Sequence, residues 1–288
     1  MVLLHLAPLA LSAVLVAPAP LRVQHDTGGK IGDVQRSADH AKKKGSGDSG
    51  DGDDSGGRSV AIFLDAPGAF LNGVVAVGKG IYLLFTYVPT LPGQGYARYP
   101  YAGDGADGSF VRQGVSVGRT FGAASVSYFA DDQSRLRATH VSTEWAGGLL
   151  HREIEFSTYA EPTPTGTDHL QMFRLTFAAA PRLGNLGYAK FGGGIQIVTL
   201  GFGDIASGPE LEAGVQLFPW RPFGVSAAAR VGPLTWNGGP QWGVSFADLT
   251  AAGSVFVGRF EIQAGYRWTR IGVGAPFRGP TLGMRVWF

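Results

Sequence analysis

The stretch GPTLGMRVWF, Gly279 to Phe288, alternates apolar side chains with polar or small ones and ends on an aromatic residue. The apolar residues are Leu282, Met284, Val286 and Phe288. The residues between them are Thr281, Gly283 and Arg285. A repeat of two places one set on each face of a β-strand. The stretch therefore predicts a strand with one apolar and one polar face.

The same alternation recurs upstream, in stretches bounded by Gly and Pro. The clearest examples are residues 153–156, 173–177, 210–217, 223–231 and 260–269. Short turns are expected near Gly118, Ala146, Pro181, Phe218 and Gly258, and longer loops at 89–108, 160–168, 201–209, 232–241 and 273–278. Short and long connections thus alternate along a series of antiparallel hairpins.

The aromatic closing strand and this series of hairpins resemble bacterial outer-membrane β-barrel proteins, as a general class and without a specific family. The resemblance implies an all-β fold: a transmembrane, antiparallel, up-and-down β-barrel of about 12 strands, within a range of about 10 to 14. It also implies a Gram-negative cell envelope, location in the outer membrane, and contact with outer-membrane lipid and lipopolysaccharide. Phe288 would be read by the barrel-assembly machinery.

Three segments are expected along the chain. Residues 1–20 are apolar and end in small residues, with Ala17-Pro18-Ala19 as a cleavage pattern, which predicts a signal peptide. Residues 21–58 are rich in Gly, Ser and Asp and predict a disordered linker. Residues 59–288 are expected to form the outer-membrane barrel, with 59–78 either an additional hairpin or a short plug.

Composition excludes several classes of protein. The chain has no cysteine, so no disulfide framework holds it together. Its formal net charge of +2 gives no reason to propose nucleic acid as a partner. We expect no cofactor and no metal: the run Asp51 to Gly56 begins like a calcium loop, but Ile62 stands where such a loop needs a bidentate glutamate.

In a barrel the polar face of each strand points into the lumen, and here that face carries both charges. The candidate lumen residues are Glu153, Glu155, Arg174, Lys190, Glu210, Glu212, Arg230, Glu261, Arg267 and Arg285. Simple hairpin register sets Glu153 opposite Arg174, and Glu210 opposite Arg230. Two interpretations stay open: the charges neutralise one another in a narrow interior, or they line a pore and select solutes.

The expected function is accordingly a passive pore or a structural barrel at the cell surface, and not an enzyme. One alternative is a barrel subunit that anchors a larger envelope complex through residues 21–58. Another is a lipid-modifying enzyme, because His140 and Ser142 share one strand face in the order seen in outer-membrane lipases. That pair lacks the flanking asparagines of those families.

Overall fold

The computed structural model describes part of the chain. The described ranges are 29–46, 100–101, 121–147, 149–164, 166–183, 186–201, 204–236, 244–272 and 274–288. The expected signal peptide, the calcium-like run and the strands expected between 59 and 120 lie outside these ranges, as does loop 89–108 apart from residues 100–101.

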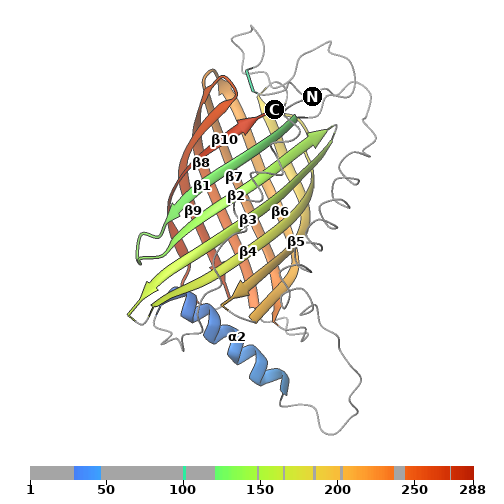
Figure 1. Ribbon diagram of the computed structural model, residues 1–288. Coiled ribbons are helices and arrows are strands. Elements are labelled where there is room, and N and C mark those ends of the chain that lie inside the picture. The colour runs from blue at the N-terminus through green and yellow to red at the C-terminus, as the bar shows by residue number, and fades with distance from the viewer. Residues whose placement is uncertain are drawn as a thin grey trace, which may run out of the picture.

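The described strands form one closed antiparallel β-barrel in which each strand pairs with its neighbours in sequence (Figure 1). The strands are β1 Phe121–Ala130, β2 Arg137–Gly147, β3 Leu150–Thr163, β4 Gly166–Ala179, β5 Gly187–Leu200, β6 Asp204–Trp220, β7 Phe223–Trp236, β8 Val244–Val257, β9 Phe260–Ile271 and β10 Phe277–Trp287. The barrel closes where β1 pairs with β10.

The closing pair is continued one residue beyond β10. The N–H of Gly122 donates to the carbonyl of Phe288 at 2.9 Å, and the N–H of Phe288 donates to the carbonyl of Gly122 at 2.8 Å. A side chain at Gly122 would collide with the Phe288 ring. Glycine at this position therefore lets the aromatic ring lie over the seam.

The number of strands differs from the prediction: the barrel has ten, not about twelve. The prediction counted apolar alternations between residues 80 and 118 as strands of the wall. Because β1 begins at Phe121 and pairs directly with β10, the described wall has no free edge at which further strands would add. The count falls within the wider range of about 10 to 14.

Several loops are shorter than expected because the strands are longer. The β3–β4 hairpin pairs Thr163 with Gly166, so most of the expected 160–168 loop is strand. The tight turn expected at Gly258 is confirmed: Val257 pairs with Phe260, and Gly258 has a φ of 62°, which favours glycine. The turns after β2, β4, β6 and β8 share one end of the barrel with Phe121 and Trp287. We call this the short-turn end, and the opposite end the long-loop end.

The two faces of the wall have opposite chemistry. The interior face carries the buried charged side chains, whereas large apolar side chains are exposed on the exterior face. Those with about half or more of their surface exposed include Tyr128, Phe191, Ile195, Leu211, Val231, Phe260, Ile262 and Leu282. This distribution is the reverse of the one in a water-soluble domain.

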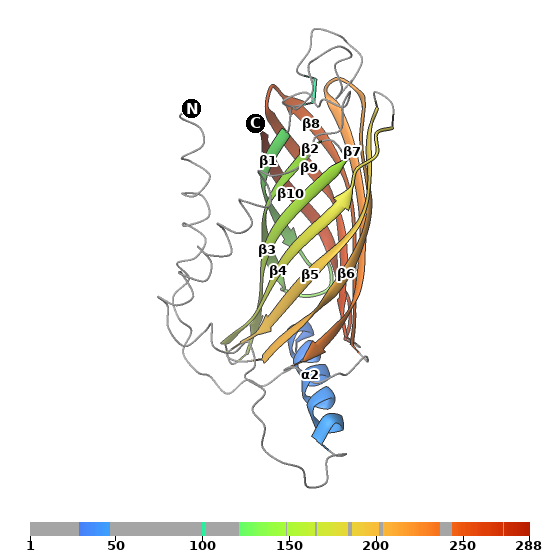
Figure 2. The same cartoon turned by 90° about the vertical axis from the view of Figure 1, so that its right-hand side faces the viewer.

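One helix, α2 (Lys30–Ser46), lies at the long-loop end, away from the C-terminus (Figures 1 and 2). This helix lies within the segment 21–58, for which the sequence predicts a disordered linker. Ile31, Val34 and Ala38 recur at helical spacing and are almost completely buried. They join an apolar cluster with residues such as Tyr159 and Phe277 in the mouth of the barrel. The polar composition of this segment conceals the stripe, because a helix with so few apolar residues becomes stable only against a partner surface.

A second apolar cluster fills the short-turn end. It contains Tyr101, Phe121, Phe218, Phe256 and Trp287, whose rings meet edge-on or tilted at centroid distances of 5.2 to 6.4 Å. The described part of the chain thus forms a charged middle layer between two apolar layers. No helix in that part has the length and apolar character needed to cross a membrane.

Candidate functional site: the barrel lumen

The structure places all ten candidate residues on the interior face of the barrel. All but Arg285 are at most 9% exposed, and the Arg285 side chain is 15% exposed. The ion pairs form two sets. The larger set joins strands β3 to β9 through Glu153, Glu155, Arg174, Lys190, Glu210, Glu212, Arg230, Asp248 and Arg267, and the smaller set joins Glu144 and His151 to Glu261 and Arg285. Charges buried this deeply are tolerated only when they are paired.

The register between neighbouring strands is shifted by two residues from the expected one. Arg174 pairs with Glu155 rather than Glu153, and Arg230 pairs with Glu212 rather than Glu210. The corresponding ion pairs are 3.3 Å and 3.2 Å long. The reason is the position of the turns: the β3–β4 hairpin turns after Thr163, and β6 continues to Trp220 with an irregularity after Leu217. Each position keeps its face because a shift of two preserves the alternation.

Other ion pairs join strands that are not neighbours. Arg230 on β7 reaches Glu153 at 3.1 Å, across from β3. Arg267 on β9 reaches Glu155 at 3.0 Å. Arg174 on β4 contacts Asp248 on β8, also at 3.0 Å. These contacts run from wall to wall, so the side chains fill the middle of the lumen.

Two interior acids, Asp248 and Glu144, were not predicted from the sequence. Asp248 accepts from Arg267 Nη2 at 2.8 Å and from Thr269 Oγ1 at 2.7 Å, which makes it a second centre of the ion-pair network. Glu144 pairs with Arg285 at 3.3 Å and with His151 at 3.0 Å. The alternation of β2 and β8 could have predicted that both acids face the lumen. His140, Ser142 and Glu144 share one face of β2, and Asp248 and Thr250 share one face of β8.

His140 and Ser142 do not form a pair. His140 Nδ1 lies 2.7 Å from Oγ of Ser157, its partner on β3, and 3.0 Å from Arg267 Nη1. Ser142 Oγ lies 2.7 Å from Ser125 Oγ on β1. Both side chains face the lumen, where the wall separates them from any lipid on the exterior.

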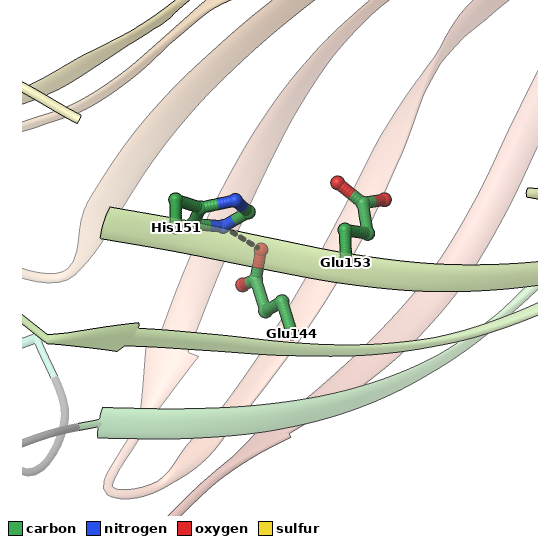
Figure 3. Close-up of side chains that lie close together, drawn as sticks. All are labelled: Glu144, His151 and Glu153. Atoms are coloured by element: carbon green, nitrogen blue, oxygen red, sulfur yellow. Dashed lines mark hydrogen bonds and ion pairs between the residues drawn. The ribbon is translucent and has the colours of Figure 1, made fainter. Parts of the chain in front are cut away.

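Glu144, His151 and Glu153 bring three metal-ligand atoms within 4.8 Å of one another (Figure 3). In Figure 3 His151 and Glu153 extend from β3, and Glu144 extends toward His151 from β2. Arg285 lies 3.3 Å from Glu144, and Lys190 lies 3.1 Å from Glu153. These basic groups already supply the positive charge that a metal ion would bring, so the cluster is built as part of the ion-pair network.

A cavity of about 130 Å³ remains beside the network. Its wall toward β1, β2 and β10 is formed by small polar residues such as Ser125, Ser127 and Thr281. His140 Nε2 and His151 Nδ1 are buried without a hydrogen-bond partner among the described residues. A polar cavity of this size holds several water molecules, which would satisfy the His140 nitrogen, because His140 lines the cavity.

Helix α2 is fixed to the long-loop mouth by two acids. Lys30 Nζ contacts both carboxylate oxygens of Asp131 at 2.9 Å and the carbonyl of Pro276 at 2.9 Å. Glu161 Oε2 accepts from the N–H of Ile31 at 2.8 Å, at the positive end of the helix dipole. Burial raises the pKa of the Asp131 carboxyl, but hydrogen bonds from Lys30 and from the N–H of Arg278 outweigh burial. The pKa therefore lies below its usual value of 3.8.

Tyr101 is inserted into the short-turn mouth. Its hydroxyl donates to the carbonyls of Trp220, at 3.0 Å, and Phe223, which links the tyrosine to the β6–β7 turn. Burial, reinforced by the negative charge of Glu261, raises the pKa of Tyr101 to about 12. The tyrosine therefore stays neutral at every physiological pH.

The class that this geometry defines is a closed, ten-stranded antiparallel barrel with an apolar exterior and a charged interior. Comparison with protein-family models found no match, and comparison with curated proteins found none. Among solved structures, the chain is similar to an outer membrane channel from Pseudomonas putida F1. The similarity has a TM-score of 0.37 at 11% identity and covers 62% of this chain and 98% of that one. Values this low carry no argument about function.

Proposed function

We propose that this chain is an outer-membrane β-barrel with a filled lumen, which serves as a structural barrel at the cell surface. The observation that carries the proposal is the reversed distribution of polarity, with exposed apolar side chains outside and ion pairs inside. Each strand has at least 10 residues, enough to cross a bilayer when tilted. In water such an exterior would promote aggregation, whereas in lipid it is stabilising.

A filled lumen is supported by three layers of side chains. The wall-to-wall pairs of Arg230, Arg267 and Arg174 occupy the middle. Tyr101 and its aromatic neighbours occupy one mouth, and α2 occupies the other. A hydrated ion would have to displace several of these groups to pass. This favours mutual neutralisation of the lumen charges over solute selection.

The proposal is tested by refolding the protein into phosphatidylcholine vesicles and fusing these with a planar bilayer. We expect migration on gels that changes with heating, which reports the folded barrel, together with no stable conductance steps. Failure to insert into lipid would contradict an outer-membrane barrel. Steady conductance from the inserted native chain would contradict a filled lumen.

A second candidate is a pore that α2 closes, and the specific contacts of Lys30 and Ile31 at the mouth favour it. Lys30→Glu would place a carboxylate against Asp131 and Glu161 and drive α2 out of the mouth. Conductance steps in this variant, with none in the native protein, would identify a gated pore. Arg36→Glu is a matched control, because Arg36 is exposed on the same helix and forms an ion pair with Asp33 one turn before it.

The structure limits how two other functions, anchoring of an envelope complex and lipid modification, could be carried out. Anchoring of an envelope complex through residues 21–58 would have to use surfaces other than the Ile31, Val34 and Ala38 stripe, which is buried in the barrel's own mouth. A pull-down with a stripe-preserving deletion of residues 47–58 tests it, and unchanged partners would exclude a role for that part. Lipid turnover by His140 and Ser142 would require a lipid to enter the lumen, and His140→Ala tests it.

A further inference from the structure

Charge on the exterior face of the described strands is confined to their ends. Alternation assigns to that face four charged residues, which are arginines within three residues of a strand terminus: Arg137, Arg152, Arg270 and Arg278. Between these ends the face is apolar or neutral. An apolar band bounded by arginines matches the profile of a bilayer, whose phosphate groups lie at the edges of the hydrocarbon.

The two ends differ in how the arginines are arranged. At the short-turn end Arg152, Arg182, Arg221 and Arg259 each lie at a different turn, so they form a ring around the barrel. At the long-loop end Arg137, Arg270 and Arg278 lie on β2, β9 and β10, and Arg135 lies in the adjoining β1–β2 loop. Strands β2, β1, β10 and β9 are consecutive in the wall. At the usual strand spacing they span about 15 Å, so these arginines form one patch.

The register brings the members of this arginine patch close together. Arg278 lies opposite Trp268 on β9, two residues from Arg270. On the other side, the N–H of Asp132 donates to the carbonyl of Arg278 at 2.9 Å, at the start of the loop that carries Arg135 and leads to Arg137. The positive groups are therefore held on a wall of paired strands.

The patch keeps an excess of positive charge. Among the described residues of the exterior face, its one acidic neighbour is Asp132, which lies 3.5 Å from Arg278 Nε and accepts from the Tyr266 hydroxyl at 2.6 Å. The other nearby acid, Asp131, is buried and bound by Lys30 of α2. Arg135, Arg137 and Arg270 are exposed.

We propose that the arginine patch binds the phosphates of a multiply phosphorylated membrane lipid, an inference that rests on the proposed membrane location. Guanidinium groups form paired hydrogen bonds with phosphate oxygens, and several such groups within about 15 Å suit a head group that carries more than one phosphate. Exposed apolar side chains continue below the patch on the same strands, among them Tyr128 and Leu282. They offer a surface for the acyl chains, so a lipid fits better than a soluble phosphate.

The test uses the full chain refolded into phosphatidylcholine vesicles, with and without a few per cent of bisphosphorylated lipid A. The readout is the temperature at which the heat-modifiable folded form is lost. We expect bisphosphorylated lipid A to raise this temperature by about 5 °C, as for a ligand that binds the folded state alone. Phosphatidylglycerol at equal charge, and inorganic phosphate, should give less than half of that shift.

Variants then locate the effect. Arg137→Gln, Arg270→Gln and Arg278→Gln combined should abolish the shift, whereas Arg182→Gln, Arg221→Gln and Arg259→Gln combined should retain it. An equal shift with phosphatidylglycerol, or a full shift in the first triple variant, would overturn the inference while leaving the barrel proposal intact. Failure of the native chain to insert into any vesicle would overturn both.

Discussion

At the scale of single residues, the charged layer depends on groups that each hold several partners. Arg230 is the clearest case, since its guanidinium contacts Glu153, Glu155, Glu212 and Asp248 at 3.1 to 3.5 Å. Removing one member of a buried ionic set leaves its partners uncompensated, which costs more than the set contributes as a whole. The network is therefore sensitive to single substitutions.

Arg230→Met is expected to destabilise the folded barrel by about 3–5 kcal/mol, because the carboxylates around it lose their shared cation. Urea titration of the refolded protein, followed by heat-modifiable migration, measures the change. Arg221→Gln is the control, since Arg221 is exposed in the β6–β7 turn, and it should cost less than about 0.5 kcal/mol. Equal effects of the two substitutions would argue against a paired lumen.

Tyr101 gives a second prediction at this scale, on alkaline stability. Its pKa is raised to about 12 in the folded state from an ordinary value of 10, so the neutral hydroxyl is favoured by folding. The stabilisation is complete below pH 10 and is lost as the pH rises through about 12. Tyr101→Phe should remove this part of the pH dependence, measured as the unfolding midpoint between pH 9 and about 12. A profile identical to that of the native chain would show that the ring is not inserted.

At the scale of elements, α2 illustrates a helix that a partner surface stabilises. Its residues are mostly polar, and the face that carries Ile31 and Val34 is covered only in the mouth of the barrel. The pairing of Lys30 with Asp131 fixes where the helix begins. Because the pKa of Asp131 is lowered by docking, docking is favoured above pH 3.8 and weakens as the pH falls below that value.

Asp131→Asn should release α2 in neutral solution. The chain has no cysteine, so Val34→Cys introduces a single thiol that is buried when the helix is docked. Loss of a hydrogen-bonded ion pair of this kind should raise the rate of maleimide labelling about tenfold. Arg36→Cys on the exposed side of α2 should label equally fast with or without Asp131→Asn. Unchanged labelling at position 34 would argue against docking through Lys30.

At the scale of the whole molecule, the two faces of each strand meet different surroundings: the proposed lipid on the exterior and the polar lumen on the interior. Ile262 on β9 is half exposed on the exterior, whereas its neighbour Gln263 faces the lumen and donates to Glu261 at 2.9 Å. A charge placed on the lipid face must be desolvated, but a positive charge in this lumen meets an excess of carboxylates. Adjacent positions should therefore respond in opposite ways.

Ile262→Arg is expected to lower the stability of the inserted barrel by about 2–4 kcal/mol, and Gln263→Arg by clearly less. Urea titration in phosphatidylcholine vesicles compares the two variants. Similar costs at both positions would contradict a lipid-facing exterior. In a detergent with a short acyl chain, the difference in stability between the two variants should be smaller.

The sequence by itself determined which residues face the lumen and that the chain forms a series of antiparallel hairpins. Alternation at Glu153, Arg174 and Arg230 assigns a face whatever the register, because a shift of two residues preserves it. Only the tertiary structure decided the strand number, the partners of each charge, and the place of α2. Closure between Ala123 and Trp287, the wall-to-wall pair of Asp248 with Arg174, and the mouth that receives Ile31 all join residues far apart in the chain. Such contacts depend on where every turn falls, and local periodicity does not encode that position.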